Sequence, residues 1–337
     1  MRNNAPTIND VALRASVSKT TVSHVINETR HVDAETRQRV LAAIAAIGYR
    51  PNKVARSLTT KRTGTIGMVV SDASNLFFGE MLRGVEEISR PANDALIVCN
   101  TDETLESEDH SLNLLLGQRV DGIIAAATSQ KWAVLAKAEA THTPIVFVDR
   151  RFDGLVGPYV GADNVDGALR GTTHLIEHGY REIGVLAGFQ RLSTMRERLL
   201  GFRQALAAHA IPLPEEWVVT SPLGIEPGRQ AAYQILSQSP RPRALFVNNN
   251  LLSLGLLLQL KEMGLRCPED VAIVGFDDHP WAAVSDPPLT VVRQPAREIG
   301  RQAAEMLYSL IAGRPLASET VEMHCELIVR RSACRSE

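Results

Sequence analysis

The most concentrated set of hydrogen-bonding side chains near the N-terminus lies between residues 18 and 27. Its members are Ser18, Lys19, Thr20, Thr21, Ser23, His24 and Asn27. On one helix, such side chains can reach the edges of bases and the oxygens of phosphates. A merely solvated helix face is the alternative, but it would more often carry Glu and Lys. The pattern therefore favours a surface that recognises nucleic acid.

A second set of polar side chains follows the apolar runs in the rest of the chain. The segments are 71–72, 100–102, 149–151, 191–198, 248–250 and 277–278. If the apolar runs are parallel strands, these carboxylates, amides and guanidinium groups meet beyond the carboxyl ends of the strands. There they can hold the hydroxyls of a small polar ligand. Any single one of them is as easily a helix cap or a turn residue, so their number together predicts a pocket.

The motifs of common enzymes and metal sites do not occur in the sequence. There is no GxGxxG after the first apolar run, no phosphate-binding GxxxxGK, no GxSxG and no HExxH. Asp277 and Asp278 resemble a general-acid pair, but adjacent residues at a strand end point apart. The four cysteines, Cys99, Cys267, Cys325 and Cys334, are scattered. We therefore expect reduced thiols, no cofactor, no metal and no enzyme.

Charge is distributed unevenly along the chain. Residues 1–62 hold eleven lysines and arginines against four acidic residues, whereas the remaining residues hold 25 basic and 34 acidic ones. A basic N-terminal part on an acidic body suggests that the N-terminal part meets a polyanion. A solvated basic surface is the alternative.

Three short helices account for the N-terminal part. Thr7 and Ser18 are good N-caps for helices at 8–15 and 19–27, with a tight turn between them. Asp33 would cap a third helix at 34–47, and Gly48 would end it. The inward residues of that third helix would be Val40, Leu41, Ile44 and Ile47. Two short helices joined by a turn, with a third closing the core, form the helix-turn-helix pattern.

The segment 51–62 follows as a basic linker. Pro51 excludes Arg50 from the preceding helix, and Asn52 could cap a further short helix. Such a segment is too short to be a stable helix alone. It would fold only when docked on DNA or against a second copy, or else serve as a plain linker.

The remainder alternates between strand-like and helix-like segments. Strands are expected at 66–70, 95–100, 122–127, 145–149, 183–187, 217–220, 244–248 and 271–277. Helices are expected at 78–89, 106–118, 131–140, 165–178, 197–208, 227–238 and 251–263. Continuous apolar strands separated by helices predict parallel sheets covered on both faces. There are too many units for one sheet, so the fold class is α/β, with a helix-turn-helix head and a two-lobed, doubly wound body.

The N-terminal part resembles the head and hinge of the lactose-repressor (LacI/GalR) family. The matching residues are 7–12, 17–27, 48–52 and 54–58, and the head is most similar to the purine and ribose repressor branch. The resemblance implies base contacts by Lys19, Thr20, His24 and Arg30. It implies phosphate contacts by Ser18, Thr21, Ser23 and Asn27. Val54 and Ala55 would pack two hinge helices together, and Leu58 would be a wedge in the minor groove.

The body resembles the periplasmic sugar-binding fold that this family uses as its sensor. The matching segments are 71–78, 119–124, 274–278 and 288–294. The resemblance implies an effector site lined by Phe78, Asp149, Arg198, Asn249, Asp277 and Gln294. It also implies domains at 1–50 (head), 51–62 (hinge), 63–164 with 294–322 (first lobe) and 165–293 with 323–337 (second lobe).

Three residues depart from the known sensors of this family. Leu223 replaces an aromatic that stacks on the ligand in the lactose and purine repressors. Leu192 replaces an effector-binding arginine of the purine repressor, and Ala126 a ligand amide of the lactose repressor. Phe189 or Trp281 would have to supply another aromatic platform. We expect a sugar or sugar acid as effector, with a purine co-repressor as the alternative.

Partners and location follow from the same resemblance. We expect palindromic double-stranded operator DNA, a small-molecule effector, a homodimer without a tetramerising tail, and a cytoplasmic protein that is nucleoid-associated when bound to DNA. No signal peptide or membrane span is expected. The remote alternatives are a solute-binding transport component and a sugar-modifying enzyme.

Overall fold

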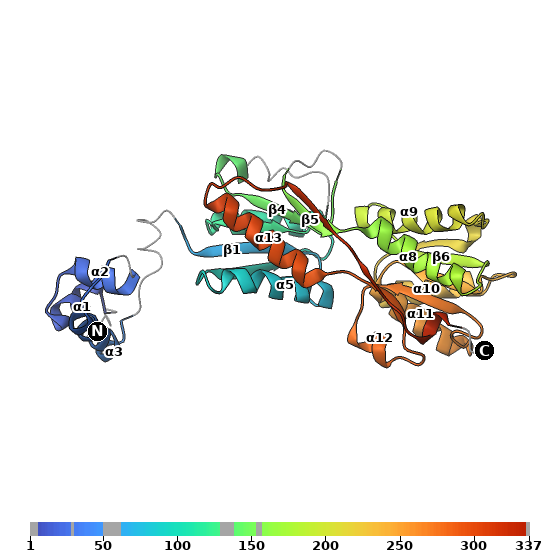
Figure 1. The fold of residues 1–337 in the computed structure, drawn as a ribbon, viewed down its shortest axis with the longest axis horizontal. Helices are drawn as coiled ribbons and strands as arrows, with labels where there is room; N and C mark the ends of the chain where they lie inside the picture. The colour runs from blue at the N-terminus through green and yellow to red at the C-terminus, as the bar shows by residue number, and fades with distance from the viewer. Residues whose placement is uncertain (1–5, 28–29, 50–61, 129–137, 153–156, 335–337) are drawn as a thin grey trace. The chain divides into compact units, whose positions relative to one another are not determined.

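The computed structural model describes residues 6–27, 30–49, 62–128, 138–152 and 157–334 (Figure 1). It divides into two compact units, 1–63 and 64–337. The hinge residues Val54, Ala55 and Leu58 lie outside the described residues. So do the side chain of Asn27 and most of the helix expected at 131–140.

The first unit is a three-helix head of α1 (Ile8–Ala15), α2 (Lys19–Asn27) and α3 (Ala34–Ile47). The backbone N–H of Thr7 donates to the Asp10 carboxylate at 2.7 Å, and the N–H of Thr21 donates to Ser18 Oγ at 3.0 Å. Gly48 ends α3 with a φ of 66°, in the left-handed region where glycine is favoured. The expected helices and their caps are therefore present.

The core of the head is small and apolar. Val11, Val22 and Val40 are completely buried in it, and Ala43 is nearly so. Leu41, expected to face inward, is instead 49% exposed. At 100° per residue Leu41 cannot share a helix face with both Val40 and Ala43, and the short Ala43 packs closely against the other two helices.

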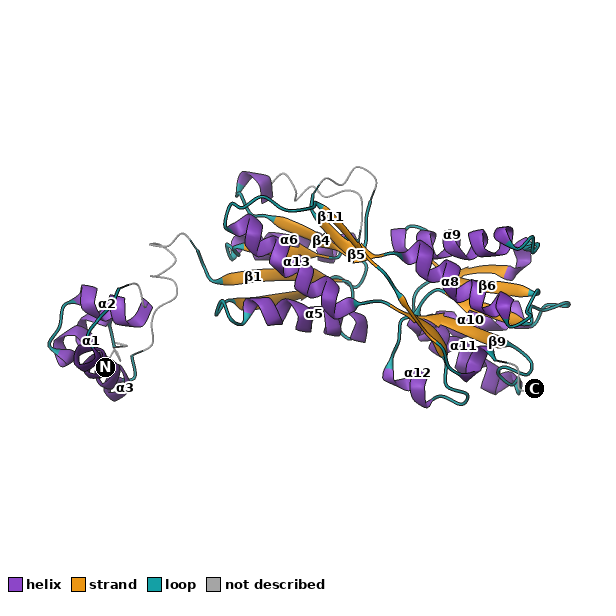
Figure 2. Cartoon of the chain, in the orientation of Figure 1, coloured by secondary structure: helices purple, strands orange, loops and turns teal. Residues whose placement is uncertain are grey.

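The second unit contains two lobes, each built on a six-stranded sheet (Figure 2). The sheet of the first lobe has the order β11-β5-β4-β3-β1-β2, and all its strands are parallel. Its strands are β1 (Thr65–Val70), β2 (Ala95–Asn100), β3 (Gly122–Ala125), β4 (Ile145–Val148), β5 (Tyr159–Ala162) and β11 (Thr320–Met323). Helices α5 (Leu76–Ser89), α6 (Leu105–Gly117) and α13 (Ala296–Ile311) pack on this sheet.

The sheet of the second lobe has the order β12-β10-β9-β8-β6-β7, and only β12 is antiparallel. Its strands are β6 (Ile183–Gly188), β7 (Val218–Ser221), β8 (Ala244–Val247), β9 (Ala272–Phe276), β10 (Thr290–Arg293) and β12 (Glu326–Ile328). Its helices are α8 (Asn164–Glu177), α9 (Ser193–Ala208), α10 (Ile225–Leu236), α11 (Asn250–Met263) and the short α12 (Pro280–Val284), with 3-10 turns at Glu215–Trp217 and Arg331–Ala333.

The chain passes between the lobes three times. The passages lie between β5 and α8, between β10 and α13, and between β11 and β12. In Figure 1 the last passage is the long red segment that leads from the first lobe into the second. These three separate connections allow the lobes to change their relative angle without unfolding.

Several elements differ from their expected form, and two of them show why. The strand β5 was not expected, because a four-residue run with Gly161 in it gives little periodicity. Helix α9 begins at Ser193 rather than at 197, because its N-cap is Leu192, which makes no side-chain capping bond. Among the described residues, no helix is long and apolar enough to cross a membrane.

Candidate functional site

A cavity of about 210 Å³ lies between the two lobes, and we call it the interlobe cavity. All six residues that the sequence predicted for a ligand site line it. They are Phe78, Asp149, Arg198, Asn249, Asp277 and Gln294. Because these residues come from both lobes, a ligand in the cavity would contact both.

Arg198 is the central cation of the cavity, on α9 of the second lobe. It is almost completely buried, with its guanidinium carbon 3.7 Å from the centre of the Phe276 ring. Its Nε donates to Asn164 Oδ1 at 2.9 Å, and its Nη1 donates to the carbonyl oxygen of Asn248 at 2.7 Å. The carboxylate of Asp277 lies 3.7 Å from Nη1. These contacts fix the guanidinium group in place before any ligand arrives.

Asp149 and Asp277 occupy equivalent positions in the two lobes. Asp149 follows β4 and Asp277 follows β9, both with a positive φ, 66° and 73°. The N–H of Asp149 donates to Val160 at 3.1 Å, and the N–H of Asp277 donates to Val292 at 2.8 Å. A non-glycine residue in the left-handed region carries strain of roughly 1–3 kcal/mol. With this backbone conformation, the side chains of both residues line the cavity.

The carboxylate of Asp149 belongs to a buried charge network in the first lobe. Arg150 Nε lies 3.2 Å from Asp149, and its terminal nitrogens donate to Glu103 at 2.7 and 2.6 Å. Burial raises the pKa of Asp149 to about 6, against the opposing effect of Arg150 and Arg198. Glu103 was not among the residues predicted, although it directly follows the predicted segment 100–102.

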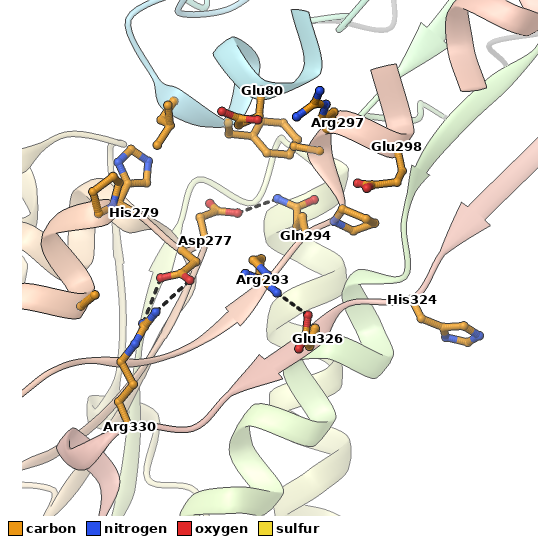
Figure 3. A pocket seen from close by; sticks show the side chains of 17 residues that line it. Glu80, Asp277, His279, Arg293, Gln294, Arg297, Glu298, His324, Glu326 and Arg330 are labelled. Atoms are coloured by element: carbon orange, nitrogen blue, oxygen red, sulfur yellow. Dashed lines mark hydrogen bonds and ion pairs between the residues drawn. The ribbon is translucent and has the colours of Figure 1, made fainter. Parts of the chain in front are cut away.

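Gln294 and Asn249 line the interlobe cavity, and each also makes a hydrogen bond within the protein. Gln294 Nε2 donates to Asp277 Oδ1 at 2.6 Å, as Figure 3 shows. Asn249 Oδ1 accepts from the N–H of Leu251 at 2.9 Å, so it caps α11. The helix-cap interpretation that the sequence left open therefore holds for Asn249 as well.

Other strand-end residues point away from the cavity. Asn100 Oδ1 accepts from the N–H of Ala73 at 2.8 Å and serves the turn. Asp278 forms a two-pronged ion pair with Arg330, with both distances 2.9 Å. Asp277 and Asp278 thus point apart, as expected of adjacent residues at a strand end.

The apolar part of the wall combines residues that the sequence placed at the ligand, Phe78 and Leu223, with others that it did not single out. Leu223 lines the cavity, and so do Phe77, Met195 and Leu251. Phe189 and Trp281, considered as a stacking platform, do not line it. Phe77 and Met195 gave no separate signal, because Phe77 has the pattern of a core residue of α5 and Met195 lies in the uncapped first turn of α9.

A larger outer cavity of about 620 Å³ adjoins the interlobe cavity. Phe77, Asp277 and Gln294 line both. The rest of its wall is highly charged, with Glu80, Arg293, Arg297, Glu298, Glu326 and Arg330 (Figure 3). Two contacts between the lobes lie close to the interlobe cavity: Asn250 Nδ2 donates to Asn75 Oδ1 at 3.1 Å, and the N–H of Arg151 donates to Ser193 Oγ at 2.9 Å.

The head carries a separate shallow hollow of about 470 Å³. Four of the residues predicted to contact DNA line it: Ser18, Thr21, His24 and Arg30. Lys19 and Thr20 are exposed on the same helix, and Ser23 is half-buried. Polar side chains at the start of an exposed helix are what a major-groove recognition helix presents.

Comparisons with known proteins agree with both halves of this description. Residues 7–52 match the model for bacterial regulatory proteins of the lacI family, and residues 172–333 match the periplasmic binding protein-like domain. The chain is 36% identical over 327 residues to the HTH-type transcriptional repressor PurR of Photobacterium profundum, covering 97% of this chain and 98% of that one.

Two solved structures extend the comparison over nearly the whole chain. One is the lac repressor dimer bound to operator and the anti-inducer ONPF, with a TM-score of 0.88 and 28% identity over 98% of this chain and 100% of that one. The other is the transcriptional regulator CelR in complex with cellobiose, with a TM-score of 0.74 and 31% identity over 97% and 99%. All these matches are regulators of transcription.

Proposed function

The chain belongs to the lacI family of bacterial regulatory proteins, as a DNA-binding repressor with an effector domain, and on this premise we propose that its effector is a neutral sugar bound in the interlobe cavity. The repressor acts on operator DNA as a dimer. The effector, the residues that hold it and the direction of the switch are parts of the proposal.

The charge of the cavity wall carries the proposal. Among the described residues, its lining contains five carboxylates, Asp72, Asp102, Glu103, Asp149 and Asp277, but only two guanidinium groups, Arg150 and Arg198. Both guanidinium groups already lie beside carboxylates. An anionic ligand would therefore meet net repulsion. Carboxylates accept hydroxyl hydrogens well, so the wall favours a neutral polyhydroxylated ligand over the sugar acid that the sequence also allowed.

The size and the apolar wall of the cavity support the same class. A volume of about 210 Å³ is below the usual range of about 300–1,000 Å³ for drug-sized sites, so it suits a monosaccharide. Leu223, Phe77 and Phe78 supply apolar surface for the face of a sugar ring. CelR, with its bound cellobiose, is a regulator of similar fold that binds a sugar.

The head and hinge would read the operator. We propose that Lys19, Thr20, His24 and Arg30 contact bases, and that Ser18, Thr21, Ser23 and Asn27 hold phosphates. Val54, Ala55 and Leu58 would act at the operator centre as hinge and wedge. Effector binding would change the angle between the lobes and, through it, the hinge. The shift in the equilibrium between the two lobe states can be no larger than the effector's difference in affinity for them allows. The protein would act in the cytoplasm, on the nucleoid, without enzymatic activity.

A thermal-shift screen of the purified protein tests the effector class. The ligands are neutral pentoses and hexoses, the matching sugar acids, and purine bases. A ligand at 100 times its dissociation constant adds about 2.7 kcal/mol of stability. We expect a neutral sugar to stabilise the protein and to release it from operator DNA. Stabilisation by a purine alone, or by a sugar acid but not its neutral parent, would overturn the proposal.

A further inference from the structure

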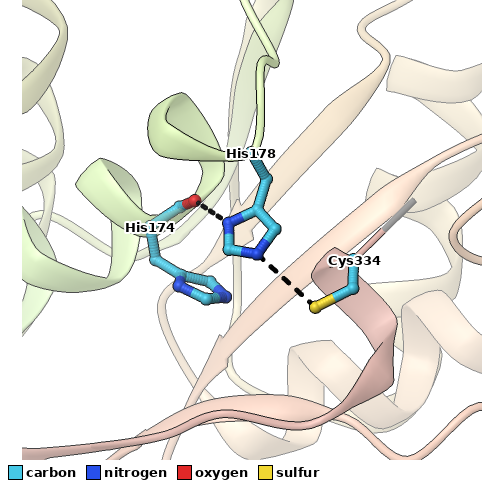
Figure 4. A group of neighbouring side chains, drawn as sticks. All are labelled: His174, His178 and Cys334. Carbon is cyan, nitrogen blue, oxygen red and sulfur yellow. Dashed lines mark hydrogen bonds between the residues drawn. The ribbon is translucent and has the colours of Figure 1, made fainter. Parts of the chain in front are cut away.

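Two histidines and a cysteine meet in the second lobe, far along α8 from the interlobe cavity. His174 lies in the last turn of α8, His178 caps that helix, and Cys334 follows the 3-10 turn Arg331–Ala333 (Figure 4). We call these three residues the His–Cys cluster. Their ligand atoms all lie within 4.8 Å of one another.

The geometry of His178 and Cys334 already suits a shared metal ion. Cys334 Sγ lies 3.6 Å from His178 Nε2. A tetrahedral zinc ion bound at about 2.3 Å to sulfur and about 2.0 Å to nitrogen separates those two atoms by roughly 3.6 Å. The other ring nitrogen, Nδ1 of His178, lies 2.8 Å from the carbonyl oxygen of His174. A bond donated there leaves Nε2 with its lone pair, which is the usual arrangement of a metal-binding histidine.

His174 supplies a separate observation. Its side chain is more than nine-tenths buried, and its Nε2 has no hydrogen-bond partner among the described residues. A buried polar nitrogen without a partner costs roughly 1–3 kcal/mol. Its ring lies 4.2 Å from that of His178, centre to centre, and Figure 4 shows the three side chains as neighbours. A metal ion between the three groups would satisfy that nitrogen.

A comparable histidine elsewhere shows what helix capping alone looks like. His209 caps α9, and its Nδ1 lies 2.9 Å from the carbonyl oxygen of Ala205, four residues earlier. It belongs to no group of potential metal ligands among the described residues. The capping bond of His178 therefore accounts for the position of Nδ1. It accounts neither for the position of Nε2 beside Cys334 nor for the burial of His174.

We propose that the His–Cys cluster binds a zinc-class divalent transition metal ion through His174, His178 and Cys334. Imidazole and thiolate are ligands that such ions prefer, and Mg²⁺ and Ca²⁺ do not. Three protein ligands leave one coordination position for water or a further ligand. The ion joins the end of α8 to the segment that follows the 3-10 turn. Sequence spacing gave no sign of it, because Cys334 lies 156 residues from His178.

Cobalt(II) absorption of the untagged full-length protein is the first test. Co²⁺ bound to a thiolate gives a charge-transfer band in the near ultraviolet, which distinguishes this cluster from the group Asp163, Asp166 and His324, which has no thiol. We expect one such site per chain, displaced by Zn²⁺ and not by Mg²⁺. The band should disappear in Cys334→Ser and persist in Cys99→Ser. It should weaken strongly in His178→Asn and persist in His209→Asn.

Thermal unfolding in a reductant that does not bind metals gives a second readout. Zn²⁺ at 100 times its dissociation constant should raise the folding equilibrium constant of the parent about 100-fold, with no such effect on Cys334→Ser. Cys334 is only half-buried, so that variant should fold normally. An absent thiolate band in the parent, or an equal band in Cys334→Ser, would show that the cluster is only packed side chains.

Discussion

Asp149 of the first lobe and Asp277 of the second lobe occupy matching positions on the two sides of the interlobe cavity. Each ends a central strand, each is strained into the left-handed region, and each bonds to the next strand through its backbone. A ligand held by both carboxylates stabilises the arrangement in which they are closest. Two like charges would otherwise repel each other there, so a hydroxyl-rich ligand is a natural bridge between the lobes.

Arg198→Ala should weaken effector binding by about 10- to 100-fold, the usual worth of a charged hydrogen bond. Arg198 is the only cation of the second lobe in the described wall of the cavity. Operator binding without effector should remain, because the head is a separate compact unit. Calorimetric titration with the sugar found in the screen measures this. Arg229→Ala is the matched control, since Arg229 of α10 pairs with Glu226 of the same helix and with Glu262 of α11, away from the cavity wall. Unchanged sugar affinity in Arg198→Ala would remove Arg198 from the site.

Two buried carboxyl groups of the first lobe should make stability depend on pH. Burial raises the pKa of Asp149 from near 4 to about 6, and that of Glu108 from 4.5 to about 7. At these two groups the folded chain therefore holds more protons than the unfolded chain between about pH 4 and pH 7. Through these two groups the free energy of unfolding falls as the pH rises, by up to about 1.4 kcal/mol per pH unit for each group.

Urea unfolding across that pH range checks the sign and its origin. Asp149→Asn should flatten the slope below about pH 6, and Glu108→Gln should flatten it up to about pH 7. The glutamine can still accept from the N–H of Thr128, as Glu108 does at 2.5 Å. Carboxylates with lowered pKa values, such as Asp33, are common to all three proteins. Identical slopes in parent and variants would contradict the assignment.

At the scale of elements, close helix contacts shape both lobes. A Cβ atom on Gly84 of α5 would lie 1.9 Å from the carbonyl oxygen of Arg297 on α13, and one on Gly300 of α13 would lie 1.9 Å from that of Met81. In the second lobe, a Cβ atom on Gly201 would lie 2.2 Å from the carbonyl oxygen of Val165. These helices pack backbone to backbone, which holds the strand ends beneath them in fixed positions.

Gly300→Ala should therefore lower the free energy of unfolding by about 1–3 kcal/mol or more, since the added carbon must push α5 and α13 apart. Gly117→Ala, also in a helix, is the control. A Cβ atom there meets nothing within 4 Å, so the substitution should be neutral or slightly stabilising. Urea unfolding compares the two. Equal stabilities of Gly300→Ala and Gly117→Ala would mean that the helices separate without cost.

The elements with strong periodicity and polar caps could be predicted, and those that depend on tertiary contacts could not. Thr7, Ser18 and Asp33 mark the three helices of the head, and Asn75 and Asn249 cap helices in the body. The first turn of α9 has no such mark, so the helix was predicted to begin only at 197. Thr194 and Met195 line the cavity within the segment 191–198 that the sequence predicted for the pocket, but neither was singled out. Residue type and position alone do not tell that Asn100 serves a turn while Asn249 lines the cavity, because both lie at the carboxyl end of a strand; only the family resemblance selected Asn249.

At the scale of the whole molecule, the lobes and the head have different tasks. The lobes share three passages and the contacts between Asn250 and Asn75 and between Arg151 and Ser193. A ligand that changes the lobe angle must break or form such contacts. Such bonds, each of about 0.5–1.5 kcal/mol, contribute to the free-energy difference between the lobe states. The ligand's difference in affinity for those states sets how far it can shift them.

Dimerisation should depend on an apolar surface of the second lobe. Val284 of α12 is 82% exposed, and Leu258 of α11 is 44% exposed; both line a hollow of about 1,000 Å³ with other leucines. Such a surface is typical of an interface between copies. Val284→Asp should therefore shift the protein from dimer to monomer in sedimentation velocity. Because a palindromic operator is read by two heads together, operator affinity should fall at least 10-fold.

The matched control for the dimer is Leu200→Asp. Leu200 is 49% exposed on α9, which packs with α8 rather than with α10 and α11, so the variant should remain a dimer with full operator affinity. Sugar affinity per chain should be unchanged in both variants, since neither residue lines the interlobe cavity. If Val284→Asp stays dimeric, the subunits meet elsewhere. If it is monomeric and still binds the operator fully, one head suffices and a palindromic site is not required.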